Sequence, residues 1–457
     1  MKRMATIDVD VCIVGAGFAG LTAARRLSEA GREVVVLEAR DRVGGRVWTR
    51  QDGDGTPLDM GATFIGPHQD RVRALVEEVG GKLFQTNVRG DSILANGGKN
   101  RRYPADKTPR INPVALASFG QALLRIDRMA KTIPIEAPWE AKKAAEWDAQ
   151  SLRAWMSKRN VPTREGREML EATFRALFAS DLSEVSLLNG LFLLQSGGGL
   201  LNFMSIEGGY QDAQVVGGVG TIVGAVAADL GDRVHLDTPV RDIELVGAGY
   251  EVRSPTGTVV RARKVVVALP PGLAGHIRYA PALPGDKALL FHQVPGGTEL
   301  KAVVVYDEPF WTADGLCGAS VCVGDSYEVT LDTTQPDHAA GVLALYCAGP
   351  MARALQRRPE SERRQEAIDT LVRRFGPKAS APRHVELENW AEQEWTRGCS
   401  MGHFGPGVLT AFGPQLRRPV GGIHFAGTET ATVSHGAMDG AVRSGERVAQ
   451  EILAAWE

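Results

Sequence analysis

The sequence predicts an α/β fold in which a Rossmann-like, dinucleotide-binding domain carries an inserted α+β domain. The first observation is an apolar strand, Val9 to Val14, that runs into the loop GAGFAG and a helix from Phe18 to Ala30. The second is another apolar strand, Glu33 to Leu37, that ends at an acidic residue, Glu38. The third is the length of 457 residues, which exceeds what one hydrophobic core usually serves and therefore predicts two domains.

Each glycine of the loop has a physical task in a strand–loop–helix unit that binds a dinucleotide. Gly15 permits the tight turn, Gly17 lets the backbone approach a pyrophosphate, and Gly20 allows the helix to pack closely on the strand. The start of the helix offers unpaired N–H groups and the positive end of its dipole to phosphate. Glu38 follows Gly20 by 18 residues, where its carboxylate can accept hydrogen bonds from both ribose hydroxyls. The loop alone is weak evidence, but between two strands and with this acid it predicts a dinucleotide site.

Two longer motifs narrow the choice of dinucleotide. The run EARDRVGGRVWT, from Glu38 to Thr49, places a glycine pair and an arginine just past the ribose acid, and HFAGTETATVSHGAMDGAVRSGERVAQEIL spans His424 to Leu453. Both runs resemble the flavin monoamine oxidase family. The resemblance extends over nearly the whole chain and is weakest from about residue 85 to 205. It implies that the dinucleotide is FAD and that the domain binding it is Rossmann-like, of the glutathione-reductase type.

The same pattern predicts that the FAD-binding domain is discontinuous. Residues 6–80, 213–288 and 393–457 are assigned to it, and residues 81–212 and 289–392 to the substrate-binding domain. From Gly80 to about Met204 the sequence is helix-patterned and punctuated by proline, so a mostly α-helical segment is expected to roof the active site. The expected helices include Pro113–Lys131, Ser151–Arg159, Arg164–Phe178 and, later in the chain, Pro359–Phe375.

The resemblance implies FAD-binding roles for residues near both ends of the chain. A strand from His424 to Ala426 delivers Gly427 and Glu429 to the cofactor, and a helix that begins near Gly436 directs its N-terminus at the flavin pyrimidine. There the helix dipole stabilises the negative charge that two-electron reduction leaves. The expected FAD-binding residues are Gly15, Gly17, Phe18, Ala19, Gly20, Glu38, Ala39, Arg40, Gly44, Gly45, Arg46, Gly61, Ala62, Thr63, Val240, Trp390, Cys399, Gly427, Glu429 and Met438.

One lysine is the candidate catalytic residue. Lys301 lies in ELKAVVVYDEPFW, which is similar to the family segment whose lysine holds a water molecule against N5 of the flavin. A lysine on a strand is more often a solvated edge residue, but here an apolar run and EPFW follow it, as in the family. The resemblance implies that Lys301 orients water for imine hydrolysis or for reoxidation by oxygen.

A tryptophan and a cysteine bear on how FAD is held. Trp390 and Cys399 stand nine residues apart in NWAEQEWTRGCS. In mitochondrial-type monoamine oxidases such a pair packs on the flavin, and the cysteine bonds to the 8α carbon. A thioether through Cys399 is therefore one interpretation. The alternative, which we favour, is a small buried thiol beside FAD that carries no covalent bond, as in many bacterial relatives.

The expected substrate pocket departs from the family pattern. The classical amine oxidases place two tyrosines face to face in front of the flavin, and Ser400 and Ala437 occupy those positions here. Losing two phenol rings should widen the pocket and admit a bulkier or more polar substrate. Gln211 matches a substrate-lining glutamine of the family, and Tyr210 stands beside it.

Four further side chains have two interpretations. His435 and His403 lie near the missing tyrosines and are candidates to replace them or to act as acid–base groups. Phe178 and Phe203 are candidates for the pocket wall. For all four, a packed side chain with no role in the site is the alternative.

Together these features predict an FAD-dependent oxidase that converts an amine to an imine, while oxygen is reduced to hydrogen peroxide. The imine then yields an aldehyde plus ammonia or an amine. The segment DMGATFIGP lacks the arginine that amino-acid oxidases of the superfamily carry there, so an amino-acid substrate is not expected. Two alternatives stay open: an FAD enzyme that desaturates or dehydrogenates C–C bonds of a bulkier substrate, and a non-catalytic amine-oxidase-like module.

Composition argues against several other partners. Lysine plus arginine number 52 against 54 for aspartate plus glutamate, so the net charge of −2 favours neither nucleic acid nor an anionic membrane. No run approaches the roughly 20 apolar residues of a membrane-spanning helix. The first strand begins too early for a signal peptide, so a cytoplasmic enzyme is expected. The five cysteines show no metal-type pairing, so neither a metal nor a disulfide framework is expected, and a homodimer stays open.

Overall fold

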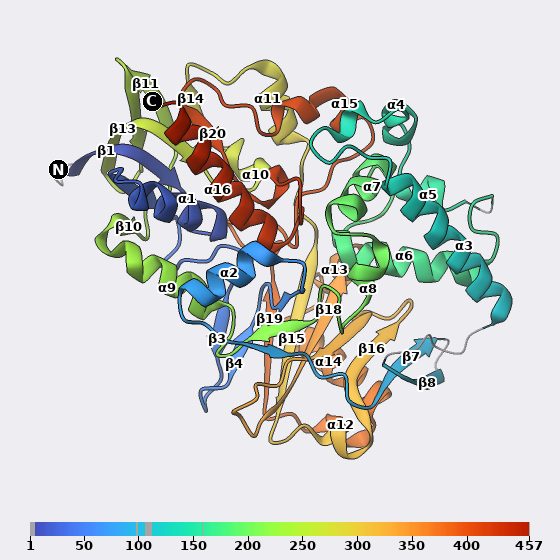
Figure 1. Ribbon diagram of the computed structural model, residues 1–457. Helices are drawn as coiled ribbons and strands as arrows, with labels where there is room; N and C mark the ends of the chain where they lie inside the picture. Colours follow the sequence, from blue (N-terminus) through green and yellow to red (C-terminus); the bar gives the residue numbers. More distant parts are fainter. Residues whose placement is uncertain (1–4, 97–98, 106–111, 158, 457) are drawn as a thin grey trace.

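Two β-sheets organise the computed structural model, which describes residues 5–96, 99–105, 112–157 and 159–456 (Figure 1). Within these ranges the first sheet has eight strands in the order β10-β2-β1-β13-β12-β11-β14, with β20 beside β13. β1 pairs in parallel with both β2 and β13 and so lies inside the sheet. The strands are β1 (Ala5–Val14), β2 (Val34–Leu37), β10 (Val234–His235), β11 (Asp242–Val246), β12 (Gly249–Arg253), β13 (Thr258–Val267), β14 (Arg278–Ala280) and β20 (Ile423–Phe425).

The second half of strand β1, Val11 to Val14, is buried on both faces, as in parallel sheets that are covered on each side. Val11 and Ile13 pack into the core beneath the helices of one face, whereas Cys12 and Val14 belong to the core on the other face. The helices of the first face are α1 (Phe18–Glu29), α9 (Gly220–Leu230) and α16 (Met438–Ala454). Helix α16 comes from the end of the chain and packs against α1, so segments from both ends of the chain cover the same face of the first sheet (Figure 1).

The turn from β1 into α1 depends on two glycines. Gly15 has a φ of +102°, and a Cβ there would lie 2.9 Å from the carbonyl oxygen of Ala268, just past β13. A Cβ on Gly20 would lie 1.9 Å from the carbonyl oxygen of Gly15. Neither position has room for a side chain, so the tight turn and the close helix–strand approach that the sequence predicts are both present.

The second sheet has seven strands among the described residues, in the order β19-β15-β18-β17-β16-β7-β8. Strand β15 is buried along its whole length, and its side chains alternate between two cores. Leu300 packs in the core beneath helix α14, whereas Val303 packs with Leu58 on the other side. The alternation places Glu299 and Lys301 on the side of Val303. The elements are β7 (Asp91–Asn96), β8 (Lys99–Pro104), β15 (Glu299–Tyr306), β16 (Leu316–Cys322), β17 (Val329–Asp332), β18 (Gly341–Ala348), β19 (His384–Asn389) and α14 (Glu360–Phe375).

A group of helices, teal and green in Figure 1, lies beside both sheets. These helices are α3 (Pro113–Ala130), α4 (Ala144–Asp148), α5 (Leu152–Trp155), α6 (Arg164–Phe178), α7 (Leu187–Ser196) and α8 (Leu200–Met204). Side-chain hydroxyls cap three of them: Ser151 caps α5, Thr163 caps α6 and Ser186 caps α7. Thr163 Oγ1 accepts a hydrogen bond of 3.1 Å from Gly166 N at the start of α6, and Ser186 Oγ accepts one of 3.0 Å from Asn189 N at the start of α7.

The remaining elements are short and connect these layers. The strands are β3 (Thr49–Gln51), β4 (Pro57–Asp59), β5 (Phe64–Ile65), β6 (Leu83–Gln85) and β9 (Ala213–Val215), of which β5, β9 and β6 form a small sheet. The helices are α2 (Asp70–Glu78), α10 (Pro271–Ala274), α11 (Gly285–His292), α12 (Phe310–Ala313), α13 (Pro350–Leu355) and α15 (Val408–Phe412). The 3₁₀ turns are Pro138–Glu140, Gly231–Arg233, Pro377–Ser380, Gly413–Gln415 and Thr428–Thr430.

The α/β fold class is confirmed, and two long helices follow their predicted bounds. α6 spans Arg164–Phe178 as expected, and α14 begins one residue after the predicted Pro359. The predicted helix Ser151–Arg159 is wrong, because only Leu152–Trp155 is helical and residue 158 lies outside the described ranges. Asn160 Nδ2 donates a hydrogen bond of 2.6 Å to the carbonyl oxygen of Trp155, which satisfies that carbonyl where the helix stops.

The expectation of a mostly helical segment from Gly80 to Met204 is wrong at its beginning. Residues 83–104 contain β6, β7 and β8. Strand β7 pairs in parallel with β16, and Ile93 stands opposite Ser320. β7 also pairs antiparallel with β8, the next strand in the sequence. The hairpin joins the second sheet through β16, a partner more than 200 residues away that local periodicity does not reveal.

Three further expectations concern the domain assignment, membrane-spanning helices and the cysteines. The assignment of chain segments to two domains stays a prediction. No helix in the described ranges is long and apolar enough to cross a membrane. All five cysteines are free.

Candidate active site

A cavity of about 1550 Å³ is lined by the first sheet, the second sheet and the helices beside them. Residues of the β1–α1 loop contribute one wall, residues of β16, β17 and β18 a second, and residues of α3 and α6 a third. Cavities for drug-sized ligands usually measure about 300–1,000 Å³. The volume therefore suits a large cofactor together with a substrate.

Glu38 is fixed at the dinucleotide end of this cavity. Its Oε2 accepts a hydrogen bond of 2.8 Å from Ala16 N, and its Oε1 accepts one of 3.0 Å from Arg40 N. A carboxylate has about four lone-pair positions, so two remain for ribose hydroxyls. At Gly17 a Cβ would meet nothing closer than the carbonyl oxygen of Gly44 at 3.8 Å, which leaves space for a ligand against the backbone. Gly17 is also the N-cap of α1 and has no side chain to occupy the first N–H groups.

Arg46 and Glu429 form an ion pair beside the cavity, in which Glu429 is buried and Arg46 is partly exposed. Arg46 Nη1 and Nη2 donate to the two carboxylate oxygens at 2.7 and 3.1 Å, and Nη1 also donates to the carbonyl oxygen of Ser400 at 2.9 Å. Glu429 accepts a further bond of 3.0 Å from Gly402 N. Burial alone would raise the pKa of Glu429, but the charge and hydrogen bonds of Arg46 hold this pKa below its usual value. Glu429 therefore positions Arg46, which lines the cavity.

Lys301 lies directly behind the cavity wall. Its side chain is fully buried, and Nζ donates to the carbonyl oxygen of Gly61 at 2.9 Å and to Thr63 Oγ1 at 2.7 Å. Nζ also lies 4.9 Å from the ring centroid of Tyr346. Gly61, Thr63 and Tyr346 line the cavity, whereas Lys301 is not part of its wall. Two of the three ammonium protons are thus engaged, and one remains for another acceptor.

Trp390 and Cys399 occupy different positions relative to the cavity. Trp390 is fully buried, and its Nε1 donates to the carbonyl oxygen of Met60 at 2.9 Å, so it packs behind the wall. Cys399 lines the cavity, and its backbone N donates to the carbonyl oxygen of Gly297 at 3.0 Å. Burial, and next the charge of Glu299, raise the pKa of the Cys399 thiol well above its usual value. The thiol is therefore protonated.

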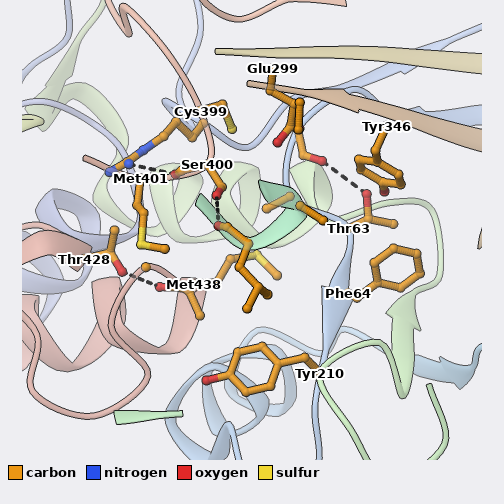
Figure 2. Close-up of a pocket in the computed structure, with 18 of the residues that line it drawn as sticks. Thr63, Phe64, Tyr210, Glu299, Tyr346, Cys399, Ser400, Met401, Thr428 and Met438 are labelled. Carbon is orange, nitrogen blue, oxygen red and sulfur yellow. Dashed lines mark hydrogen bonds between the residues drawn. The ribbon is translucent and has the colours of Figure 1, made fainter. Parts of the chain in front are cut away.

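The five expected pocket residues, Tyr210, Gln211, Ser400, His435 and Ala437, all line the cavity. Tyr210 stacks on Phe203, with ring centroids 4.2 Å apart, and Phe203 lines the cavity too. Ser400 Oγ donates to the carbonyl oxygen of Leu177 at 3.3 Å. Figure 2 shows Ser400 and Tyr210 on opposite sides of the cavity.

The two histidines are separated by the fold. His435 packs between Phe192 and Phe404, with ring centroids 4.8 and 6.1 Å away, and burial lowers its pKa to about 4. It is therefore neutral near pH 7. His403 does not reach the cavity: its Nδ1 hydrogen-bonds with Ser180 Oγ at 3.0 Å, and burial lowers its pKa to about 4 as well. Phe178 also stays in the core, with its side chain fully buried.

Most residues that the sequence assigns to FAD share the cavity wall. Gly20, Trp390 and Glu429 do not line the cavity. They lie behind its wall, where Gly20 packs against Gly15, Trp390 donates to Met60 and Glu429 accepts from Arg46. The residues that line it are Gly15, Gly17, Phe18, Ala19, Glu38, Ala39, Arg40, Gly44, Gly45, Arg46, Gly61, Ala62, Thr63, Val240, Cys399, Gly427 and Met438.

Sequence reasoning missed several side chains of the wall. Phe64 and Tyr346 lie on one side of the cavity in Figure 2, and Phe64 belongs to the DMGATFIGP segment singled out above. Glu299 stands two residues before Lys301, so the period of a strand could have indicated it. Glu328 receives two hydrogen bonds of 2.7 Å from Arg175, and no motif indicated this pair.

Comparison with known proteins agrees with this geometry. Residues 18–453 match the model of a family described as flavin containing amine oxidoreductase. The chain belongs to this family. It is 36% identical over 449 residues to a flavin-containing amine oxidase of Danio rerio, covering 98% of this chain and 86% of the relative. An amine oxidase B of Cavia porcellus is also 36% identical, over 97% of this chain and 86% of its own length.

Solved structures of amine oxidases have the same fold. Wild-type putrescine oxidase bound to putrescine superposes with a TM-score of 0.94 at 31% identity, covering 98% of this chain and 100% of that one. Cyclohexylamine oxidase from Brevibacterium oxydans gives a TM-score of 0.94 at 33% identity, covering 98% and 99%. The predicted membership is confirmed, and this flavin-containing amine oxidase is an FAD-dependent enzyme that oxidises amines.

The residues that line the cavity are suited to bind FAD. The space at Gly17 and the spare lone pairs of Glu38 suit a pyrophosphate and a ribose. At the far end Met438 begins α16, whose N-cap Ala437 has no side-chain hydrogen bond to its first N–H groups. Such a helix start stabilises negative charge on a reduced flavin ring.

Proposed function

We propose that this amine oxidase oxidises the carbon–nitrogen bond of an amine to an imine and passes the electrons to O₂, giving hydrogen peroxide. The imine then yields an aldehyde plus ammonia or an amine. The observation that carries the proposal is that one cavity has three parts in its wall. These are the dinucleotide-binding motif with Gly17 and Glu38, Thr63 with its hydrogen bond from Lys301, and an apolar pocket. FAD, when bound, supplies the two-electron acceptor, and the protein supplies position and electrostatics.

The residues near both chain ends would hold FAD in this proposal. Glu38 would accept the ribose hydroxyls, the start of α1 would bind the pyrophosphate, and Arg46, held by Glu429, would reach the cofactor from the side. The start of α16 at Met438 would stabilise charge on the ring. Trp390 would support Gly61 from behind, because a Cβ on Gly61 would lie 3.1 Å from the Trp390 ring.

Lys301 would hold a water molecule with its third ammonium proton. Its two other protons are engaged by Gly61 and Thr63, which fixes the direction of the remaining one. Because Gly61 and Thr63 themselves line the cavity, the water would sit at the wall next to the substrate. This role is that of a positioned proton donor for imine hydrolysis or for reoxidation by oxygen.

The substrate would be an amine of moderate bulk. Ser400 and Ala437 leave the cavity wide where larger side chains would close it, and Phe64, Tyr346 and Tyr210 provide apolar or aromatic wall. A desolvated wall of this kind favours an apolar substituent on the amine. FAD is proposed to be bound without a covalent bond, because the raised pKa keeps Cys399 in the thiol form, which is a poor nucleophile.

A cytoplasmic location is also proposed. The five cysteines are free, which is the usual state in a reducing compartment.

Anaerobic mixing of the FAD-loaded protein with primary, secondary and polyamine substrates tests the proposed function. Bleaching of the flavin by an amine, followed by peroxide on admission of air, is the expected result. A flavin that stays oxidised with every amine, yet is bleached by an unsaturated hydrocarbon precursor, would support the alternative of C–C oxidation. A flavin that no compound bleaches would support a non-catalytic module.

A further inference from the structure

Glu299 is a buried carboxylate of the cavity wall that none of the roles above uses. Its exposed fraction is 9%, and it lines the cavity. In Figure 2 its side chain points into the cavity between Cys399 and Tyr346. Within the described part of the chain, no hydrogen bond or ion pair reaches its carboxylate oxygens. An isolated buried carboxylate is costly, so a site that keeps one indicates a cationic partner.

The other carboxylates of the cavity wall have partners or face solvent. Glu38 accepts hydrogen bonds from two backbone amides, and Glu328 receives two from Arg175. Glu207 and Glu394 are exposed. Among the described residues that line the cavity, Glu299 is thus the one buried carboxylate without a partner.

The neighbours of Glu299 leave its charge uncompensated at close range. Lys301 shares its side of β15, but Nζ donates to Gly61 and Thr63 and forms no ion pair with Glu299. The other titratable groups nearby are Tyr346 and Cys347 on β18 and Cys399 after β19, and each is neutral near pH 7. Burial raises the pKa of Glu299 to about 7, although the charge of Lys301 lowers it in part. The carboxylate is therefore basic enough to exchange a proton near neutral pH.

We propose that Glu299 binds the ammonium group of the incoming amine and accepts one of its protons. One N–H bond of the ammonium breaks, one O–H bond forms on the carboxylate, and the electron pair stays on nitrogen as the lone pair. No oxidant takes part, and the proton later returns to solvent. The inference rests on the proposed function, since it names the group that recognises the substrate of that same site.

Binding of an amine that cannot be oxidised tests this step without turnover. Cumylamine has no hydrogen on the carbon next to nitrogen, and cumyl alcohol is its uncharged counterpart of the same shape. Both are titrated calorimetrically into FAD-loaded wild type, Glu299→Gln, Glu299→Asp and the control Glu362→Gln, which removes an exposed charge of α14 that does not line the cavity. Glu299→Gln is expected to weaken cumylamine binding about tenfold or more and to leave cumyl alcohol within about twofold.

The variants and the pH dependence show whether Glu299 binds the ammonium group or only supports the structure of the cavity wall. Glu299→Asp keeps the charge and is expected to bind cumylamine more tightly than Glu299→Gln, while Glu362→Gln is expected to match wild type. Wild-type binding of cumylamine should strengthen as the pH rises through about 7, because Glu299 ionises in this range. Glu299→Gln should lack this increase in affinity.

Three results would overturn the inference. The first is that Glu299→Gln binds cumylamine as tightly as wild type does. The second is that Glu299→Gln loses affinity for cumylamine and cumyl alcohol equally. The third is that Glu299→Gln changes the flavin absorption spectrum but not the binding of cumylamine. Failure of the proposed function is seen separately, as a wild-type flavin that no amine bleaches.

Discussion

The guanidinium of Arg46 and the carboxylate of Glu429, 383 residues apart in the sequence, form two hydrogen bonds of 2.7 and 3.1 Å at the cavity edge. Arg46 follows the ribose acid of the N-terminal motif, and Glu429 precedes the C-terminal helix α16. The pair therefore joins the two chain ends at the point where the proposed cofactor site is built. Since Glu429 also accepts from Gly402 N, it anchors the loop that carries Ser400.

Glu429→Ala should destabilise the protein and weaken FAD binding. Removing one partner of a largely buried ion pair leaves the other charge unpaired and costs about 3 kcal/mol of unfolding free energy. Urea unfolding and flavin content after purification measure the two effects. The control is Glu360→Gln on the surface of α14, whose exposed pair with Arg364 should contribute at most about 1 kcal/mol. Equal stability of the two variants would contradict the role of Glu429.

The contribution of Glu429 should also depend on pH. Its pKa is lowered in the folded protein, so the stabilisation is complete above the unfolded value of about 4.3 and is lost as the pH falls through the folded value. The stability difference between wild type and Glu429→Gln should therefore be constant from about pH 7 to 5 and shrink below about pH 4. A difference that grows on acidification would show that another group dominates.

Glu38→Ala should reduce the retention of FAD. The variant removes the acceptor that Ala16 N and Arg40 N hold in place for the ribose hydroxyls, and two charge-assisted bonds are worth about 3 kcal/mol, or roughly a hundredfold in affinity. The flavin-to-protein ratio after gel filtration is the measurement. Glu38→Gln keeps one acceptor oxygen and should lie between the variant and wild type. Full flavin content in Glu38→Ala would argue against the assigned ribose contact.

Lys301→Met should slow flavin turnover more than it weakens amine binding. The methionine keeps the bulk of the side chain but cannot donate to Gly61, Thr63 or a water molecule. Loss of a positioned proton donor typically costs about a hundredfold in rate. Stopped-flow measurement of reduction and reoxidation, alongside KM for the amine, checks this. If only KM changes, Lys301 does not hold the proposed water.

Ala437→Tyr should narrow the pocket and shift preference toward small arylalkylamines. Ala437 has φ −104° and ψ 167°, an extended conformation that tyrosine adopts without strain, and it lines the cavity. Rates for a series of amines of increasing bulk, in wild type and variant, measure the shift. Ala437→Ser serves as the control that leaves the pocket open. An unaltered substrate profile would show that this position does not face the substrate.

Acid precipitation should release the flavin from the protein. The Cys399 thiol is protonated, and a thiol attacks far more slowly than a thiolate, so no thioether is expected. The yellow colour should stay in the supernatant for wild type and for Cys399→Ala alike. Colour that remains in the wild-type pellet and is absent from the Cys399→Ala pellet would demonstrate a covalent bond.

The sequence alone predicted a helix or a turn correctly where the residues that determine it lie in one short segment. The β1–α1 unit is an example, because the steric limit at Gly20 is set by the carbonyl oxygen of Gly15, five residues earlier in the same unit. Helix α6 is another, since its Thr163 cap and its apolar periodicity lie within the predicted bounds. Such features depend on backbone sterics and on a 3.6-residue period, both of which a sequence displays.

The tertiary structure alone decided what depends on distant partners. It placed β6 beside β9 and β7 beside β16, and it separated His435, which lines the cavity, from His403, which hydrogen-bonds with Ser180 outside it. It also left Glu299 unpaired in the wall although Lys301 is two residues away. The physical reason is that pairing and burial are set by contacts between segments hundreds of residues apart, which local periodicity and propensity do not specify.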